Sequence, residues 1–170
     1  MSRRSTEPAW RPWGAARRAV EAPSPAQAAE EAFFEAVLAA AGERYDLGPE
    51  HVALAWTLTT WQPGLTAAEA RALFLVTLVS LVDQAQGSTR TRVLGPEGRA
   101  HLEQVLAELL PGEGAQAAAE AQAIGELLGA QQARLPVVLA AVAAPPAEPP
   151  PQPLVLEGAY LYPQALLLAE

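Results

Sequence analysis

A continuous apolar run from Leu73 to Val82 is the feature that most restricts how this chain can fold. Almost every position in the run is apolar, whereas an ordinary surface helix keeps one polar face. Thr66 and Glu69 precede it with the spacing of a capping box, in which a hydroxyl and a carboxylate bind backbone amides of the first turn. The run therefore predicts a central helix that is buried on most sides and covered by the other elements.

Further stretches with helical spacing lie on both sides of this run, so the fold class is predicted as mainly α, a bundle of about five to six helices. Gly42 is expected to stop the first helix, and the GPEG stretch at 95–98 is interpreted as a turn. Pro136 is expected in the first turn of the last helix. The predicted helices besides the central one are 26–41, 49–61, 102–110, 115–129 and a short one over 136–142.

A small antiparallel β element is predicted beside the helices. Gly87 is expected to end the central helix, and a short strand is expected near 89–94. A hairpin is expected at 154–162, where Gly158 supplies the positive φ that a tight turn requires. Two strands alone are marginally stable, so the hairpin should pair with the strand near 89–94 or lie against the helices.

The sequence also suggests how the 170 residues are organised. Proline removes backbone donors, so the proline-containing N-terminal stretch and the arm with six prolines in ten residues are expected to lack regular structure. The expected segments are a flexible basic Pro/Trp-containing tail (1–26), a helical domain (27–143), a Pro-rich arm (144–153), and the hairpin with the start of a connecting helix (154–170).

Charge is distributed unevenly along the chain, whose net charge is −8. Residues 1–22 hold five arginines and two glutamates, a balance of +3, and the remainder holds six arginines and 17 carboxylates, a balance of −11. An acidic body repels phosphate backbones, so direct DNA contact by the body is not expected. No stretch approaches the ~20 apolar residues of a membrane span, and no secretory signal follows the first arginines. A cytoplasmic protein without membrane contact is therefore expected.

Residues suited to catalysis or to metal binding are scarce. Cysteine and lysine are absent and histidine occurs twice, which excludes disulfides, thiolate sites, His-rich metal sites and a P-loop lysine. The glutamates on the helices lie opposite the apolar stripes, where solvation explains them. We therefore expect no cofactor, no metal and no catalytic residue in this chain.

Aromatic side chains are the candidates for partner binding, because Trp, Tyr and Arg are enriched at the anchors of protein interfaces. Two tryptophans in the basic tail are expected to dock on the body or on a partner. Trp56 is expected in the core instead, and the tyrosines of the hairpin can equally serve only to cover it. The candidate partner-binding residues are Trp10, Trp13, Trp61, Tyr160 and Tyr162.

The stretch PLVLEGAYLYPQALLLAE resembles the segment that follows the N-terminal domain in the RecD family, the alpha subunit of exodeoxyribonuclease V. That family carries P-hydrophobic-hydrophobic-L-x-G-D-x-L-Y-L, followed by a helix with R-x-W and a glutamate. Ala159, Ala165 and Leu167 stand where the family has aspartate, arginine and tryptophan. The apolar helix, Gly87 and a short strand also follow the family's order over 66–170. The hairpin residues that match are Pro153, Leu154, Val155, Leu156, Gly158, Leu161 and Tyr162, with Glu170 beyond them.

The resemblance implies a non-catalytic assembly domain. In that family the N-terminal domain contacts a RecC-like scaffold and tethers the motor to a RecB-like helicase–nuclease, a machine that unwinds and degrades DNA at double-strand breaks. The ATPase motor would begin downstream of Glu170, and this chain would be the docking module, either truncated from a longer subunit or encoded alone.

Two other hypotheses remain at this point. The first is a free-standing helical protein–protein adaptor unrelated to DNA repair. The second is a winged-helix-like nucleic-acid module, against which the acidic body and the lack of a basic recognition helix both count.

Overall fold

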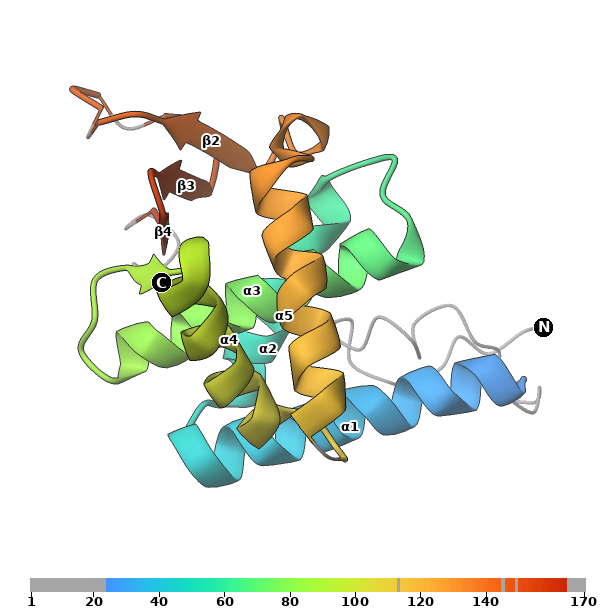
Figure 1. The fold of residues 1–170 in the computed structure, drawn as a ribbon. Helices are drawn as coiled ribbons and strands as arrows, with labels where there is room; N and C mark the ends of the chain where they lie inside the picture. Colours follow the sequence, from blue (N-terminus) through green and yellow to red (C-terminus); the bar gives the residue numbers. More distant parts are fainter. Residues whose placement is uncertain (1–23, 113, 145, 149, 165–170) are drawn as a thin grey trace.

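A computed structural model describes residues 24–112, 114–144, 146–148 and 150–164. Over these residues the protein is mainly helical, with five α-helices, one short 3-10 helix and four strands in a single sheet, and the predicted fold class is confirmed. Figure 1 shows the sheet at one end of the helical body and α1 across the opposite end. The elements are α1 (Pro25–Tyr45), α2 (Pro49–Trp61), α3 (Ala67–Ala85), β1 (Thr91–Arg92), α4 (Gly95–Leu109), α5 (Gly114–Gly129), η1 (Gln132–Arg134), β2 (Leu139–Val142), β3 (Leu154–Glu157) and β4 (Tyr160–Pro163).

Helix α3 is the central element, as its sequence predicts. All of its residues from Ala72 to Asp83 are buried, and it packs against α2, α4 and α5 as well as against β1 and β4. The capping box is present, because the Thr66 hydroxyl accepts a hydrogen bond from the Glu69 backbone N–H at 3.2 Å. A helix with apolar residues on all sides thus has partners on all sides.

Two hydroxyls of α3 differ from each other. Thr77 Oγ1 donates to the Leu73 carbonyl at 2.8 Å, so this hydroxyl is satisfied by the preceding turn. Ser80 Oγ, in contrast, is buried and has no hydrogen-bond partner among the described residues.

The observed helix boundaries agree in most places with those predicted from the sequence. Helix α2 has the predicted bounds, and α5 begins within one residue of its predicted start. Helix α1 continues through Gly42 to Tyr45, so the predicted stop at Gly42 is wrong. The left-handed residue that ends α1 is Asp46, with φ of 55°, and the next amide, Leu47 N–H, donates to the Ala41 carbonyl at 3.1 Å.

The GPEG stretch forms the first turn of α4, and its interpretation as a separate turn is wrong. Gly95 has φ of +78°, a value that favours glycine, and Pro96 occupies the start of the helix, where its missing N–H costs nothing. Gly98 lies close to β1, because a Cβ on it would be 2.7 Å from the Val93 carbonyl carbon. This close approach seats α4 against the strand.

A tyrosine joins the first and fourth helices. Tyr45 Oη donates to Glu108 Oε2 at 2.7 Å. Burial raises the pKa of the Tyr45 hydroxyl, and the adjacent Glu108 carboxylate raises it further, so Tyr45 stays protonated and keeps donating well above neutral pH.

The sheet has the strand order β1-β4-β3-β2. Strand β4 pairs with β3 and with β1, both antiparallel, and the Thr91–Leu161 register confirms that the hairpin joins the strand after Gly87. Strands β2 and β3 are parallel, so the sheet is mixed and not purely antiparallel as predicted.

The short helix predicted over 136–142 is wrong, because Leu139–Val142 is strand β2. A short apolar run bounded by proline suits a buried strand as well as one helical turn, and its spacing alone does not decide between them. The Leu154 N–H donates to the Val138 carbonyl at 3.0 Å, which aligns β2 along β3. Pairing with β3, not local preference, selects the strand.

Candidate functional site

Strand β4 presents two kinds of side chain on its two faces. Leu161 is fully buried and belongs to the hydrophobic core, and Pro163 is also buried. Tyr160 and Tyr162 alternate with them and are half-buried on the opposite face. Successive side chains of a strand point to opposite faces, so the two tyrosines share the face turned away from the core.

Arginines from the neighbouring strand extend this outward face. Arg92 is the β1 residue paired with Tyr160, and Arg90 lies two positions earlier, on the same side. The Arg90 guanidinium carbon is 3.9 Å from the centre of the Tyr160 ring, and that of Arg92 is 5.7 Å from it. Both distances are within the range of cation–π attraction. We call the set Arg90, Arg92, Glu157, Tyr160 and Tyr162 the Tyr/Arg face.

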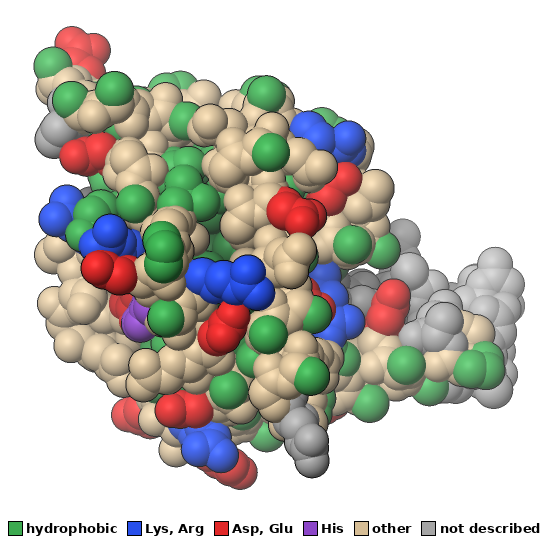
Figure 2. Space-filling view, in the orientation of Figure 1, with side chains coloured by type: hydrophobic (Ala, Val, Ile, Leu, Met, Phe, Trp, Pro, Cys, Tyr) green, Lys and Arg blue, Asp and Glu red, His purple; other side chains and the backbone are tan. Residues whose placement is uncertain are grey.

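Carboxylates balance part of this positive charge. Arg92 Nη1 lies 2.6 Å from Glu97 Oε2, at the first turn of α4. Glu157 is paired with Tyr160 across the hairpin, on the same face. Figure 2 shows hydrophobic side chains at the surface near the sheet, with arginine and carboxylate groups beside them.

The surroundings of Tyr162 change the pKa of its hydroxyl. Burial raises the pKa of its hydroxyl, and the negative charge and hydrogen bonding of Glu157 raise it further. The hydroxyl is therefore a neutral hydrogen-bond donor at physiological pH. A protonated phenol beside a carboxylate is suited to polar recognition at the rim of an interface.

The hairpin turn fixes how the Tyr/Arg face is held. Gly158 and Ala159 form a two-residue turn in which Gly158 has φ of +59°, as the sequence predicts. The Ala159 carbonyl accepts a hydrogen bond from Val93 N–H at 2.8 Å. This bond joins the tip of the hairpin to the end of β1, and so keeps the tyrosines beside the arginines.

Trp61 lies in a different place, at the end of α2. It is 48% exposed, and Val137, equally exposed, is close to it in the fold because Gln62 Oε1 accepts the Val137 N–H at 2.9 Å. We call Trp61 and Val137 the junction patch.

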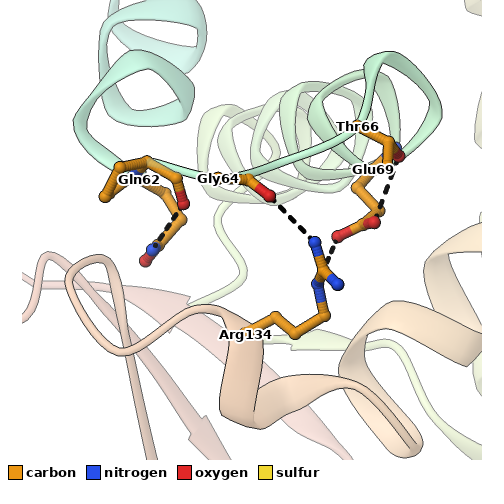
Figure 3. A network of polar contacts seen from close by, with 6 residues as sticks. Gln62, Gly64, Thr66, Glu69 and Arg134 are labelled. Atoms are coloured by element: carbon orange, nitrogen blue, oxygen red, sulfur yellow. Dashed lines mark hydrogen bonds and ion pairs between the residues drawn. The ribbon is translucent and has the colours of Figure 1, made fainter.

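An arginine braces the loop next to the junction patch (Figure 3). Arg134 Nη2 donates to the Gly64 carbonyl at 2.8 Å, and Arg134 Nε lies 2.8 Å from Glu69 Oε2. Glu69 is also the partner of Thr66 in the capping box. The contacts fix the loop between α2 and α3 against η1.

The structure therefore brings together some of the candidate residues and separates others. Tyr160 and Tyr162 share one face, Trp61 belongs to the junction patch, and Trp10 and Trp13 lie outside the described residues, as does the predicted connecting helix after residue 164. Trp56 contacts the core as expected, edge-on to Phe74 at 5.9 Å between ring centres. The remaining motif residues have structural positions: Gly87 and Gly158 have positive φ, and Pro153, Leu156 and Leu161 are buried.

Arg90 and Arg92 were missed by the sequence reasoning. The period-two spacing of the arginines in STRTR, next to a predicted strand, was the available signal. It indicates a shared face, but it does not show that the face receives the hairpin tyrosines.

One further polar pair lies between helices α3 and α4. His101 Nε2 is 2.8 Å from Asp83 Oδ2, and the Asp83 carboxylate is buried while the imidazole is partly exposed. Within the described ranges, no group of three or more His, Asp or Glu side chains is placed to hold a metal ion. The pair links the end of α3 to α4.

Comparisons of this chain with protein-family models, with curated proteins and with solved structures find no match in any of the three. The RecD-like hairpin thus stays a resemblance of sequence. Among the helices in the described part of the chain, none combines the length and the apolar character needed to cross a membrane.

Proposed function

We propose that this chain is a non-catalytic docking domain that binds a partner polypeptide through the Tyr/Arg face. The observation that carries the proposal is the stacking of Arg90 on Tyr160, next to Tyr162, on the side of the sheet turned away from the core. Aromatic residues and arginine are the side chains that most often anchor protein interfaces. Because β1, β3 and β4 hold them in register, little side-chain freedom is lost when a partner binds.

The resemblance to RecD suggests the partner. We propose that the chain acts as the N-terminal assembly domain of a RecD-like subunit, which docks on a RecC-like scaffold and joins a RecB-like helicase–nuclease in the cytoplasm. Double-strand break repair would be the process served. The hairpin motif from Pro153 to Tyr162 supports this assignment, and so does the order of apolar helix, Gly87 and short strand before it, since both belong to the sequence pattern shared with that family.

Charge favours a protein partner over DNA. Residues 23–170 carry six arginines and 17 carboxylates, a balance of −11, and such a surface repels phosphate. Arg92 is already engaged by Glu97. A partner with both carboxylates and apolar grooves could satisfy Arg90 and the tyrosines together.

Co-purification tests this proposal. The full chain is expected to bind a RecC-like scaffold from the same genome, and the double variant Tyr160→Ala/Tyr162→Ala is expected to bind at least about tenfold more weakly, the equivalent of 1.4 kcal/mol. Arg90→Ala is expected to weaken binding as well. Arg44→Ala is its matched control, because Arg44 is exposed at the end of α1, away from the sheet. A chain that never associates with the scaffold would refute the RecD-like assignment.

The alternative is a free-standing helical adaptor unrelated to DNA repair. The exposed junction patch is the observation in its favour, since it exposes two large apolar side chains on segments that the Val137–Gln62 hydrogen bond joins. The variant Trp61→Ala separates the two proposals. If Trp61→Ala binds the scaffold as well as the unchanged chain does, the result supports docking through the Tyr/Arg face. If the unchanged chain does not bind the scaffold but binds another protein, and Trp61→Ala no longer binds that protein, the result supports the adaptor.

A further inference from the structure

A second surface of the molecule is an alanine-floored groove between helices α1, α3 and α5. It has a volume of about 500 Å³, within the range of sites that accept bulky ligands or side chains. Alanines on all three helices leave the space, because their side chains are too short to fill it. The lining includes Ala29, Phe33, Trp56, Ala67, Ala119 and Ala123.

Charged groups border this groove. Arg71 Nε lies 2.9 Å from Glu120 Oε1, and the Arg71 guanidinium carbon is 3.8 Å from the centre of the Phe33 ring. Glu30 lies on the lining as well. The groove thus combines an aromatic and aliphatic floor with a rim of two carboxylates and one arginine, a balance of −1, which suits an occupant that carries both aromatic rings and cations.

Residues 1–23 of this chain contain both aromatic and cationic side chains. They contain Trp10 and Trp13, and residues 1–22 have a balance of +3 from five arginines and two glutamates. The first eleven residues of α1, 25–35, carry three glutamates (Glu30, Glu31 and Glu35) and no cation, a balance of −3. The two stretches are therefore complementary in charge.

The geometry of the connection favours the same occupant. Helix α1 begins at Pro25, and Ala29, one turn later, already lines the groove. Trp13 precedes Pro25 by 12 residues, a length that can extend to at most about 40 Å, so it can return to the groove without strain. A tethered segment also has an effective concentration in the millimolar range, which favours it over a free competitor.

We infer that the N-terminal segment folds back onto its own body and places Trp10 or Trp13 in the alanine-floored groove, with its arginines beside the glutamates of α1. This assigns the tail tryptophans to an intramolecular contact. The inference does not depend on the proposed scaffold, because its groove is separate from the Tyr/Arg face.

Paramagnetic relaxation in the full chain tests it. The protein has no cysteine, so Ser5→Cys provides one unique position for a nitroxide label. The amide signals of Ala67 and Ala119 are expected to lose most of their intensity, and those of Gly158 and Leu161 on the sheet are expected to keep theirs. Uniform broadening, or none, would overturn the inference.

Two variants and one mixing experiment make the test specific. Trp10→Ala/Trp13→Ala is expected to restore the Ala67 and Ala119 signals, and Ala119→Trp is expected to displace the tail by filling the groove from α5. Ala107→Trp is the matched control, because Ala107 is exposed on α4 outside the groove. If neither Trp10→Ala/Trp13→Ala nor Ala119→Trp restores the Ala67 and Ala119 signals, the inference is wrong. In the mixing experiment, one set of chains carries only the nitroxide and the other only the isotope label that makes its amides visible. If the isotope-labelled chains show the same broadening, a second copy occupies the groove and the intramolecular contact is refuted.

Discussion

The two faces of the sheet differ in what they contribute, although the same strands make both. The inner face carries Leu154, Leu156 and Leu161, which are 0–3% exposed and belong to the core. The outer face carries Tyr160 and Tyr162 with the arginines of β1 and its flank. One face therefore holds the fold together, and the other is the face that we propose for recognition, so substitutions on neighbouring residues should affect different properties.

The largest expected difference in the free energy of unfolding is between substitutions at the neighbouring residues Tyr160 and Leu161. Leu161→Ala should lower the free energy of unfolding by about 2–5 kcal/mol, because it leaves a cavity between the sheet and α3. Tyr160→Ala removes a half-buried ring and should cost clearly less. Urea unfolding followed by circular dichroism measures both. Equal losses would show that the outer face is as much a part of the core as the inner face.

A pair of glycine substitutions tests how closely helix α4 approaches the end of strand β1. Gly98→Ala should destabilise the protein by about 1–3 kcal/mol, because the new Cβ would meet the Val93 backbone at 2.7 Å. Gly125→Ala in α5 is the control, since apart from its chain neighbours and its own helix backbone no heavy atom lies within 4 Å of its Cβ position, and it should stabilise by about 0.5–1 kcal/mol. Thermal unfolding of the two variants should shift in opposite directions. Parallel shifts would contradict the close packing of α4 on β1.

A smaller effect is expected for the guanidinium that stacks on the outer face. Arg90→Ala should change the free energy of unfolding by about 0.5–1 kcal/mol at most, since cation–π contacts at exposed sites contribute that much. Scaffold binding should fall more than stability does. Calorimetric unfolding and a binding titration on the same variant measure both, and a large stability loss without a binding loss would reverse the assignment of this face.

The smallest effect concerns Tyr162 of the outer face at alkaline pH, where the raised pKa of Tyr45 contributes to the loss of stability as well. The pKa of Tyr162 is raised in the folded state, so the unfolded chain releases this proton first, and stability should fall as the pH rises past about 10. Below pH 10 both states are protonated and the contribution is fully present. Tyr162→Phe should show a shallower loss between pH 9 and 11 (about one unit on either side of the unfolded pKa). Identical pH profiles would show that the pKa of Tyr162 is not raised in the folded protein.

Sequence reasoning succeeded where one local signal was sufficient. The apolar run predicted a buried α3, the Thr66–Glu69 pair predicted its cap, and Gly158 predicted the hairpin turn. It failed at β2, where a short apolar stretch was assigned to a helix, and at Gly42, which α1 passes through. In both places a contact distant in sequence or a later left-handed residue outweighed the local preference.

The candidate site was predictable only in part. The hairpin tyrosines were identified from residue type, but their arginine partners were not, because Arg90 and Tyr160 are 70 positions apart and only the β1–β4 register brings them together. Trp61 was identified as well, but its separation from the hairpin tyrosines depends on how α2 packs.

By itself, the sequence determined the helical class, the central helix, the hairpin and the sign of the charge on each part of the chain. These properties follow from hydrophobic spacing, capping and composition, which act over a few residues. The tertiary structure decided the parallel pairing of β2 with β3, the stacking of Arg90 on Tyr160 and the groove between α1, α3 and α5. Each of these requires segments far apart in the chain to meet, and burial of the shared core selects that arrangement.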